Sequence, residues 1–381
     1  MNCKYIYFLA INKIQFNLFL SLSINLFSYQ HTMNPSQSLS EWYSRNKRDL
    51  PWRNSPAPYE IWLSEIILQQ TRVDQGLDYF NKFISHYPDI HQLAAASVDE
   101  VLKLWQGLGY YTRARNLHAA ANEIVKKYNG RFPESYNHLI KLKGIGPYTA
   151  AAVASIAFNE PVPVVDGNVL RFLSRYYGIN VSVDTNEGKK KIYELAASII
   201  DTKNPGVHNQ AVMEFGALQC KPHNPECEEC IFKSTCYAYK YNKVNILPVK
   251  NKKTKLRKRF FNYLFITCNG KTYLNKRNSK DIWRMLYEFP LVESDRIFSE
   301  ENLILSDECQ HIFSEISQVF LMEKSVVYRH HLSHQLISAK FFHFEINEPS
   351  AVILERYMEI DLQDMHNYAI PRLIEKYLES L

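Results

Sequence analysis

The residues best suited to chemistry in this chain are two carboxylates and a glycine-rich turn that precedes the second of them. The turn contains Gly144 and Gly146 in the sequence KGIGP, and Asp166 follows a short apolar run further along the chain. A glycine turn that opens a helix at a proline leaves backbone N–H groups pointing outward, which suits a phosphate. These residues therefore predict binding of a nucleic-acid backbone close to a carboxylate.

Glu65 is the earlier carboxylate, in a helix that Pro58 can start. Its neighbours at helical spacing are Ile61, Trp62 and Leu68, so it lies on an apolar face. Desolvation there should raise the pKa of the carboxyl group and make it a candidate general acid. A structural glutamate that caps a neighbouring helix fits the same pattern, and the residues alone leave both interpretations open.

Asp166 supplies the second carboxylate that cleavage of a glycosidic bond requires. One group protonates the leaving group and another stabilises the sugar cation or bonds to it. Asp166 could also be the N-cap of the helix that contains Val169 and Leu170. The nearby glycine turn favours the catalytic interpretation.

Four of the seven cysteines fall within seventeen residues, in the pattern C-x6-C-x2-C-x5-C. A cluster with isolated cysteines elsewhere indicates metal binding in a reducing compartment rather than a disulfide framework. Four close thiolates suit an iron–sulfur cluster or a structural zinc ion. The candidate ligands are Cys220, Cys227, Cys230 and Cys236.

Charge and hydrophobic pattern divide the chain near residue 250. The net charge of +6 and the pI of about 8.7 are mild, but residues 250–259 carry seven positive charges and no negative ones. This basic segment predicts a linker, and it could also lie along phosphates. Residues 36–240 have a helical pattern, whereas the last 120 or so indicate a small α+β domain.

Helices are expected at 114–128, 135–143, 147–158 and 189–201, and a capping box at 97–100 opens another. Strands are expected at 260–268, 271–275 and 338–346, with Asn269-Gly270 as a hairpin turn. Residues 1–32 are apolar, but polar side chains interrupt them and no cleavage site follows. We expect a mis-assigned leader, with Met33 as the true start and no membrane span.

Residues 36–250 resemble the helix–hairpin–helix DNA glycosylase superfamily, and specifically the MutY adenine glycosylases. The resemblance rests on six motifs in order: LPWR at 50–53, SEIILQQT at 64–71, GLGYY at 107–111, the glycine hairpin, VDGN at 165–168 and the cysteine loop at 220–236. It implies an all-α glycosylase core over 33–249. The family's loop holds a 4Fe–4S cluster, so the resemblance favours iron over zinc.

The resemblance also implies roles for individual residues. Glu65 would protonate the flipped adenine at N7 and then activate water, while Asp166 would stabilise the sugar cation or bond to it transiently. Tyr148 and Asn168 would position these groups. The adenine pocket would be lined by Arg48, Trp52, Leu68 and Gln210. Gln70 and Tyr110 would wedge into the base stack with Thr71 near the opposing base, whereas Tyr111 is expected to pack in the core.

The C-terminal residues 260–381 resemble the Nudix-like domain by which MutY enzymes recognise 8-oxoguanine. The sequence YEFP at 287–290 matches a family landmark, and Ser333 and His334 match a lesion-contacting motif whose first residue, Leu332, departs from the usual phenylalanine. The glycine and paired glutamates that bind magnesium in Nudix hydrolases are missing from the sequence. Recognition rather than hydrolysis is therefore implied.

The implied function is monofunctional removal of adenine paired with 8-oxoguanine or guanine in duplex DNA. We expect a monomer in the bacterial cytosol, associated with the nucleoid through DNA. One alternative is an endonuclease III-like glycosylase and lyase, but that family has a lysine nucleophile where this chain has Tyr148, and tyrosine cannot form an imine. Another is a non-catalytic iron–sulfur protein that binds DNA.

Overall fold

The computed structural model describes residues 34–54, 57–251 and 256–381. The expected leader and the start at Met33 lie outside these residues. The chain divides into two compact units: one contains the described residues up to Ile61, Glu134–Ile140 and Ile145–Asn251, and the other contains Trp62–Pro133, Lys141–Gly144 and the C-terminal residues. The region predicted as one helical domain over 33–249 is thus divided between them.

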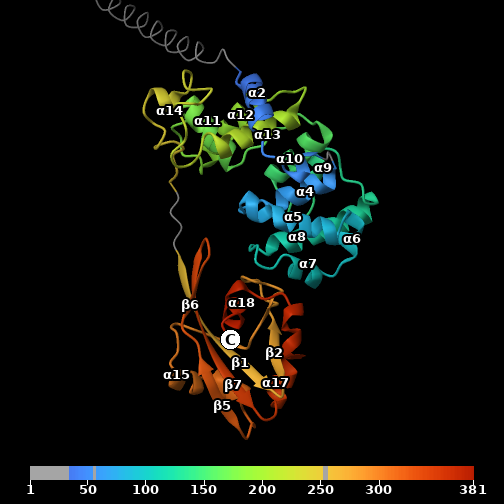
Figure 1. Ribbon diagram of the computed structural model, residues 1–381, viewed down its shortest axis with the longest axis vertical. Helices are drawn as coiled ribbons and strands as arrows, with labels where there is room; N and C mark the ends of the chain where they lie inside the picture. Colours follow the sequence, from blue (N-terminus) through green and yellow to red (C-terminus); the bar gives the residue numbers. More distant parts are fainter. Residues whose placement is uncertain (1–33, 55–56, 252–255) are drawn as a thin grey trace, which may run out of the picture. The chain divides into compact units, whose positions relative to one another are not determined.

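The first unit is helical throughout (Figure 1). Its helices are α2 (Ser36–Asn46), α3 (Pro51–Asn54), the start of α4 (Pro58–Ile67), α9 (Tyr136–Leu139), α10 (Pro147–Phe158), α11 (Gly167–Tyr177), α12 (Asn186–Ile199), α13 (Pro205–Leu218) and α14 (Tyr237–Lys240). Helix α13 packs against α2, α10 and α11. Their shared core contains Leu39, Phe172, Phe215 and Phe232, which are all buried.

The two helices that flank the glycine turn differ from each other in how well their extents were predicted. Helix α10 covers the predicted 147–158, with Pro147 in its first turn. Helix α9 is a single turn instead of the predicted 135–143. Turns and a bend follow it up to Gly144, whose φ of +75° is incompatible with a right-handed helix.

Helices α5 (Val73–His86), α6 (Ile90–Ala95), α7 (Val98–Leu104) and α8 (Thr112–Tyr128) follow α4 in the second unit. The expected capping box is present, because Ser97 Oγ accepts from the Glu100 N–H and the Glu100 carboxylate accepts from the Ser97 N–H. Helix α8 begins two residues earlier than predicted and ends at Asn129 in the left-handed conformation. In the described part of the chain, no helix is both long and apolar enough to cross a membrane.

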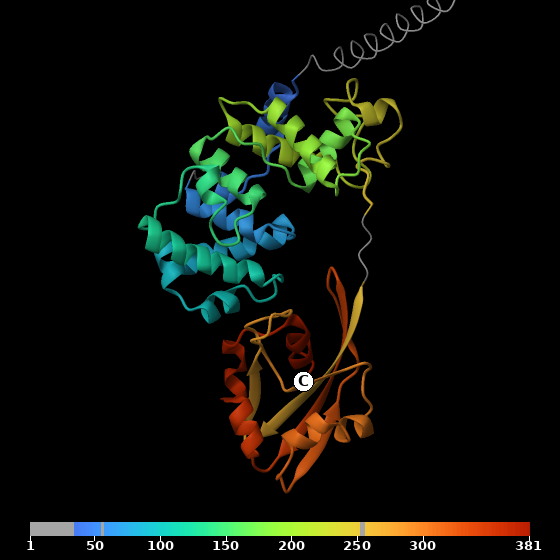
Figure 2. The same ribbon diagram turned by 180° about the vertical axis from the view of Figure 1, so that it is seen from behind.

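The C-terminal residues of the second unit form a mixed eight-stranded sheet (Figure 2). Its strands are β1 (Arg257–Cys268), β2 (Lys271–Lys276), β3 (Tyr287–Glu288), β4 (Leu291–Ser294), β5 (Val319–Lys324), β6 (Tyr328–His331), β7 (Gln335–Ile346) and β8 (Met358–Asp361). Strands β1 and β7 pair in parallel, and the other pairs are antiparallel. The predicted turn joins β1 to β2, with positive φ at both Asn269 and Gly270.

Helices cover both faces of this sheet. Helices α15 (Glu300–Ile304), α16 (Asp307–Ile312) and α17 (Ala351–Arg356) pack on the face that contains Leu264 and Phe342. On the opposite face, Tyr377 of α18 (Arg372–Leu378) stacks on Phe341, with 4.1 Å between the ring centroids. Strand β1 already begins at Arg257, so the end of the basic segment belongs to the sheet. The predicted class, a helical glycosylase core followed by an α+β domain, is confirmed.

Candidate active site and cysteine loop

Asp166 is the N-cap of α11, as one of the two interpretations of the sequence required. Its Oδ1 accepts from the backbone N–H groups of Asn168 and Val169 at 2.9 and 2.7 Å, and its Oδ2 accepts from Asn168 Nδ2 at 2.7 Å. Burial raises the pKa of Asp166 above its ordinary value, although these hydrogen bonds and Arg171 act in the opposite direction. The carboxylate is therefore rigidly oriented, and capping does not exclude a catalytic role.

Arg171 connects this carboxylate to the cysteine loop. Its Nη2 donates to Asn168 Oδ1 at 2.8 Å and to the Gly216 carbonyl at 2.6 Å, while Nε donates to the Cys220 carbonyl at 2.7 Å. A Cβ on Gly216 would come within 2.7 Å of Asn168. The close approach of α13 to Asn168 thus keeps the amide between Asp166 and Arg171.

Tyr148 lies in the first turn of α10, directly after the glycine turn. It packs with Val162, Val164 and Met213, and its hydroxyl donates to Met213 Sδ at 3.6 Å. Val164 begins the segment that leads into Asp166. Tyr148 is therefore held against the chain that carries the carboxylate.

One of the residues expected to line the adenine pocket, Arg48, binds a buried carboxylate, and two others, Gln210 and Trp52, lie close in sequence to members of this ion-pair cluster. Arg48 donates to Glu214 through Nε at 2.9 Å and Nη2 at 2.6 Å, and Arg53 donates to the same carboxylate through both terminal nitrogens. Gln210 lies one helical turn before Glu214 and accepts from the hydroxyl of Tyr43 at 2.6 Å.

The third of these residues, Trp52, is buried and adjoins Arg53 in α3. Burial alone would raise the pKa of Glu214, but hydrogen bonds from Arg48 and Arg53 outweigh it and lower the pKa to about 2. Arg48 is thus committed to an ion pair at the edge of the predicted pocket.

Glu65 and Leu68 belong to the second unit, whereas Asp166 belongs to the first. Glu65 is only 7% exposed on α4, in agreement with its predicted apolar surroundings. Leu68 follows the helix and packs tightly on α5, where a Cβ on Gly76 would come within 2.6 Å of its side chain.

The two predicted wedge residues both adopt the left-handed backbone conformation. Gln70 has a φ of 58° and Tyr110 a φ of 49°, which is uncommon for residues other than glycine. Tyr110 is half exposed, whereas Tyr111 is buried with a pKa raised to about 12 by burial. Thr71 accepts from Arg113 Nη2 at 3.3 Å. Tyr111 thus packs in the core as expected.

The two glycines of the hairpin differ in backbone conformation and in the space available for a side chain. Gly144 has a φ of +75°, and a Cβ there would come within 2.4 Å of Asn116 on α8. Gly146 is the N-cap of α10 with φ −91°, and the space around it is open. Gly146 thus leaves room for a ligand at the N-terminus of α10, where the sequence predicts a phosphate site.

Ser333 and His334 form the exposed tip between β6 and β7. The Ser333 hydroxyl lies 3.1 Å from His334 Nδ1, and the His334 carbonyl accepts from the Arg257 N–H at 3.0 Å. The tip is therefore anchored to the start of β1, where the basic segment enters the sheet. Both side chains face solvent.

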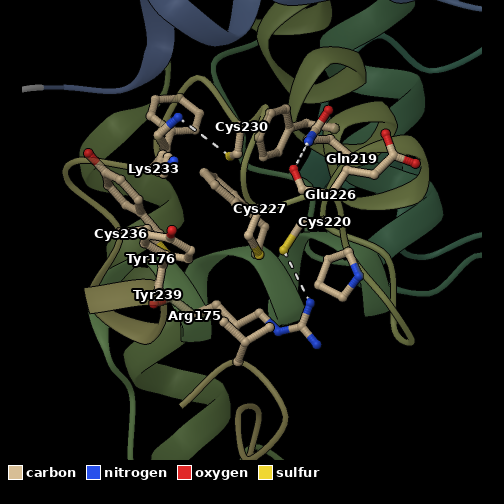
Figure 3. Close-up of a pocket in the computed structure, with 15 residues that line it drawn as sticks. Arg175, Tyr176, Gln219, Cys220, Glu226, Cys227, Cys230, Lys233, Cys236 and Tyr239 are labelled. Atoms are coloured by element: carbon tan, nitrogen blue, oxygen red, sulfur yellow. Dashed lines mark hydrogen bonds between the residues drawn. The ribbon is translucent and has the colours of Figure 1, made fainter. Parts of the chain in front are cut away.

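The four predicted metal ligands line one small cavity (Figure 3). Arg175 Nη1 donates to Cys220 Sγ at 3.4 Å, and the Phe232 N–H donates to Cys230 Sγ at 3.4 Å. In the described residues, no three His, Cys, Asp or Glu side chains converge closely enough to hold one metal ion. The four thiols surround a space rather than a point.

Ion pairs at the surface of this loop engage its lysines. Lys221 pairs with Glu226, and Lys233 pairs with Glu228, which also accepts from the Tyr239 hydroxyl at 2.7 Å. Inside the loop, Arg175 donates to the carbonyls of residues 221, 222 and 247 at 2.8 to 3.3 Å. The backbone around the cysteines is thus held by charged groups on both sides.

Sequence reasoning missed the charged residues that organise these sites. Arg53, Arg113, Arg171, Arg175 and Glu214 were assigned no role. Only Arg171 carried a local signal, because it lies one helical turn after Asn168. The partners of the others are distant in sequence, so no spacing rule identifies them.

Comparison with known proteins gives consistent relationships. A family model described as HhH-GPD superfamily base excision DNA repair protein matches residues 63–200, and a NUDIX domain model matches residues 262–380. The chain is 34% identical to the adenine DNA glycosylase of Buchnera aphidicola subsp. Acyrthosiphon pisum (strain APS), over 91% of this chain and 97% of that relative.

The chain is also 39% identical to the adenine DNA glycosylase of Buchnera aphidicola subsp. Baizongia pistaciae (strain Bp), over 78% of this chain and 82% of that relative. Among solved structures, a thermostable thymine-DNA glycosylase matches with 28% identity and a TM-score of 0.50, over 54% of this chain and 94% of that one. This chain therefore belongs to the adenine DNA glycosylases, N-glycosylases of base excision DNA repair within the HhH-GPD superfamily.

Proposed function

We propose that the enzyme removes adenine paired with 8-oxoguanine or guanine from duplex DNA, without cleaving the strand. The observation that carries the proposal is the Asp166 carboxylate, which three hydrogen bonds orient at the start of α11. Tyr148 stands where a lyase would need a lysine, and a phenol cannot form the imine that strand cleavage requires.

The adenine is flipped out of the stack, and Glu65 donates a proton to its N7. The bond between N9 and the sugar C1′ then breaks, and its electron pair leaves with the neutral base. Asp166 stabilises the resulting oxocarbenium ion or bonds to it. Water adds to C1′ and gives its proton to the Glu65 carboxylate, which restores the acid. Tyr148 and Asn168 keep these groups in position.

The remaining predicted residues serve binding. Arg48, Trp52, Leu68 and Gln210 line the adenine pocket, and the wedges Gln70 and Tyr110 offset the cost of unstacking, a few kcal/mol. Thr71 lies near the opposing base, and Gly144 and Gly146 shape the phosphate site.

The C-terminal sheet contributes recognition of the opposing base. Ser333 and His334 contact 8-oxoguanine from the tip between β6 and β7, and their exposure supports this role. The basic segment at 250–259 links the glycosylase residues before it to the recognition residues 260–381. We infer that the enzyme acts as a monomer in the bacterial cytosol and reaches the nucleoid through DNA.

A 4Fe–4S cluster is the proposed cofactor, bound by Cys220, Cys227, Cys230 and Cys236. The four cysteines fit it because all four line one cavity, and N–H donors from Arg175 and Phe232 already point at two of the sulfurs. A bound cluster crosslinks the loop and can exchange one electron. Arg171 would transmit the position of this loop to Asn168 and Asp166.

The test is single-turnover release of adenine from a duplex with adenine opposite 8-oxoguanine. Glu65→Gln should lower the rate by about 10² to 10⁴ because it removes the general acid. Glu60→Gln, on the same helix, is the matched control and should retain the wild-type rate.

Undiminished release by Glu65→Gln would contradict the mechanism. An absence of release by the wild type would favour a non-catalytic DNA-binding protein. Efficient borohydride trapping of a protein–DNA adduct would instead favour the endonuclease III-like lyase.

A further inference from the structure

We propose that Arg113 is a positioning residue that sets Gln70 and Tyr110 for insertion beside the flipped adenine. The proposal rests on the wedge roles given above and adds the device that orients the wedges. Arg113 lies near the start of α8, between the turn that carries Gln70 and the loop that carries Tyr110, all within the second unit.

One side of the Arg113 guanidinium caps the C-terminus of α4. Its Nη1 donates to the carbonyls of Ile66, Ile67 and Gln69 at 2.9, 2.8 and 2.6 Å. The last carbonyls of a helix have no intrahelical partner and form the negative end of its dipole, so a buried cation satisfies both needs. The final carbonyl belongs to the residue directly before Gln70.

The other side of the guanidinium holds the loop of the second wedge. Its Nη2 donates to the carbonyls of Leu108 and Gly109 at 3.4 and 3.2 Å. The Arg113 Cζ also lies 5.1 Å from the Trp105 ring centroid and 5.7 Å from that of Tyr110. A single planar group thus contacts both wedge segments and the side chain of one wedge.

Backbone strain at both wedges makes such support necessary. Left-handed conformations of Gln70 and Tyr110 persist only where surrounding contacts determine them. Arg113 bonds the peptide immediately before each of these residues. The strained backbone keeps the two side chains at a surface, and Tyr110 is half exposed there.

The surroundings of Arg113 are unusual for a structural arginine. It is 9% exposed, and among the described residues no carboxylate forms an ion pair with it. Burial lowers its pKa to about 10, so the guanidinium is still charged at neutral pH. Five carbonyls and a hydroxyl replace a counter-ion, and a lysine cannot reproduce that planar set of donors.

The experiment compares Arg113→Lys and Arg113→Gln with Leu117→Ala, a buried apolar residue one turn further along α8. Each full-length variant is studied for thermal unfolding, affinity for duplex DNA, single-turnover adenine release, and fluorescence of 2-aminopurine at the position of the flipped base. A double-mutant cycle combines Arg113→Lys with Tyr110→Ala.

We expect both Arg113 variants to lose 2-aminopurine unstacking and at least about tenfold in release rate, while Leu117→Ala keeps both despite lower stability. Addition of Tyr110→Ala to Arg113→Lys should lower the release rate and the unstacking of 2-aminopurine little further, because both changes disable the same wedge.

Wild-type unstacking and release in Arg113→Lys would overturn the inference alone, as would equal losses in Leu117→Ala or full additivity in the cycle. A wild type that unstacks 2-aminopurine without releasing adenine would overturn the proposed function. In that case, the 2-aminopurine fluorescence of the Arg113 variants would decide whether the inference about Arg113 is correct. A wild type that does neither would overturn both.

Discussion

Buried or partly buried arginines that donate to backbone carbonyls recur at the candidate functional elements of this enzyme. Arg113 binds the carbonyls near two wedges, Arg171 those beside the cysteine loop, and Arg175 those within it. Guanidinium groups suit this task because they present several donors in a fixed plane and stay charged when buried. Each of these arginines therefore holds loop backbone in addition to any side chain that it contacts.

Arg48 and Arg53 differ from these arginines, because both bind the buried carboxylate of Glu214. Its pKa of about 2 lies below the ordinary value of 4.5, so the stability it contributes is complete above pH 4.5 and is lost as the pH falls towards 2. That contribution is about 3 kcal/mol. Glu214→Gln should therefore lower the melting temperature at neutral pH, and the gap to the wild type should narrow below pH 4.5.

Circular dichroism melting curves between pH 3 and 7 check this prediction. Glu194→Gln is the control, because Glu194 is 62% exposed and, among the residues that the structure describes, forms an ion pair only with Lys190, at 3.8 Å. The Glu194→Gln substitution should change the melting temperature little at every pH. A Glu214→Gln deficit that stays constant down to pH 3 would contradict the assigned pKa.

At the scale of elements, the proposed site is assembled from the ends of helices. Asp166 caps the start of α11, Gly146 caps the start of α10, and Arg113 caps the end of α4. Helix termini expose unpaired backbone groups, which makes them suitable for holding phosphates, carboxylates and cations. The rigid helices behind them supply the required precision.

The hairpin glycines provide a matched test of this arrangement. Gly144→Ala should cost about 1–3 kcal/mol of stability, because it combines a φ of +75° with a contact of 2.4 Å to Asn116 Cβ. Gly146→Ala should cost less than about 1 kcal/mol, since its φ is negative and nothing lies within 4 Å of the added atom. Urea unfolding of the two variants measures the difference, and equal losses would contradict it.

At the scale of the whole molecule, the C-terminal sheet carries an exposed polar tip that is chemically separate from the adenine chemistry. Simultaneous Ser333→Ala and His334→Ala substitutions should weaken the preference for 8-oxoguanine over guanine opposite adenine, because they remove the polar groups that we propose contact the lesion. The rate on the adenine–guanine pair should remain close to that of the wild type.

Parallel single-turnover assays on the two duplexes measure this preference. His311→Ala, an exposed histidine of α16 on the same sheet domain, is the control and should leave both rates unchanged. A loss of rate on both duplexes in the double variant would indicate a general binding role for the tip instead.

Short-range features of this protein were predictable because their partners lie within a few residues. The capping box at Ser97, the turn at Asn269-Gly270 and the start of α10 at Pro147 follow from local backbone chemistry. The order of six motifs identified the family, and separate motifs at 287–290 and 333–334 indicated the Nudix-like domain. The short extent of α9 was missed, because residues 140–143 form turns and a bend although their hydrophobic pattern is compatible with a helix.

What the sequence by itself determined is thus the inventory of chemical groups: two carboxylates, a glycine turn, four cysteines and a basic segment. The tertiary structure alone decided which charged groups meet. Arg48 and Arg53 meet Glu214 across more than 160 residues, and Arg113 meets the end of α4 across 46. Such pairings depend on how the helices pack. A sequence contains many possible acceptors for each arginine, and the packing determines which of them the guanidinium meets.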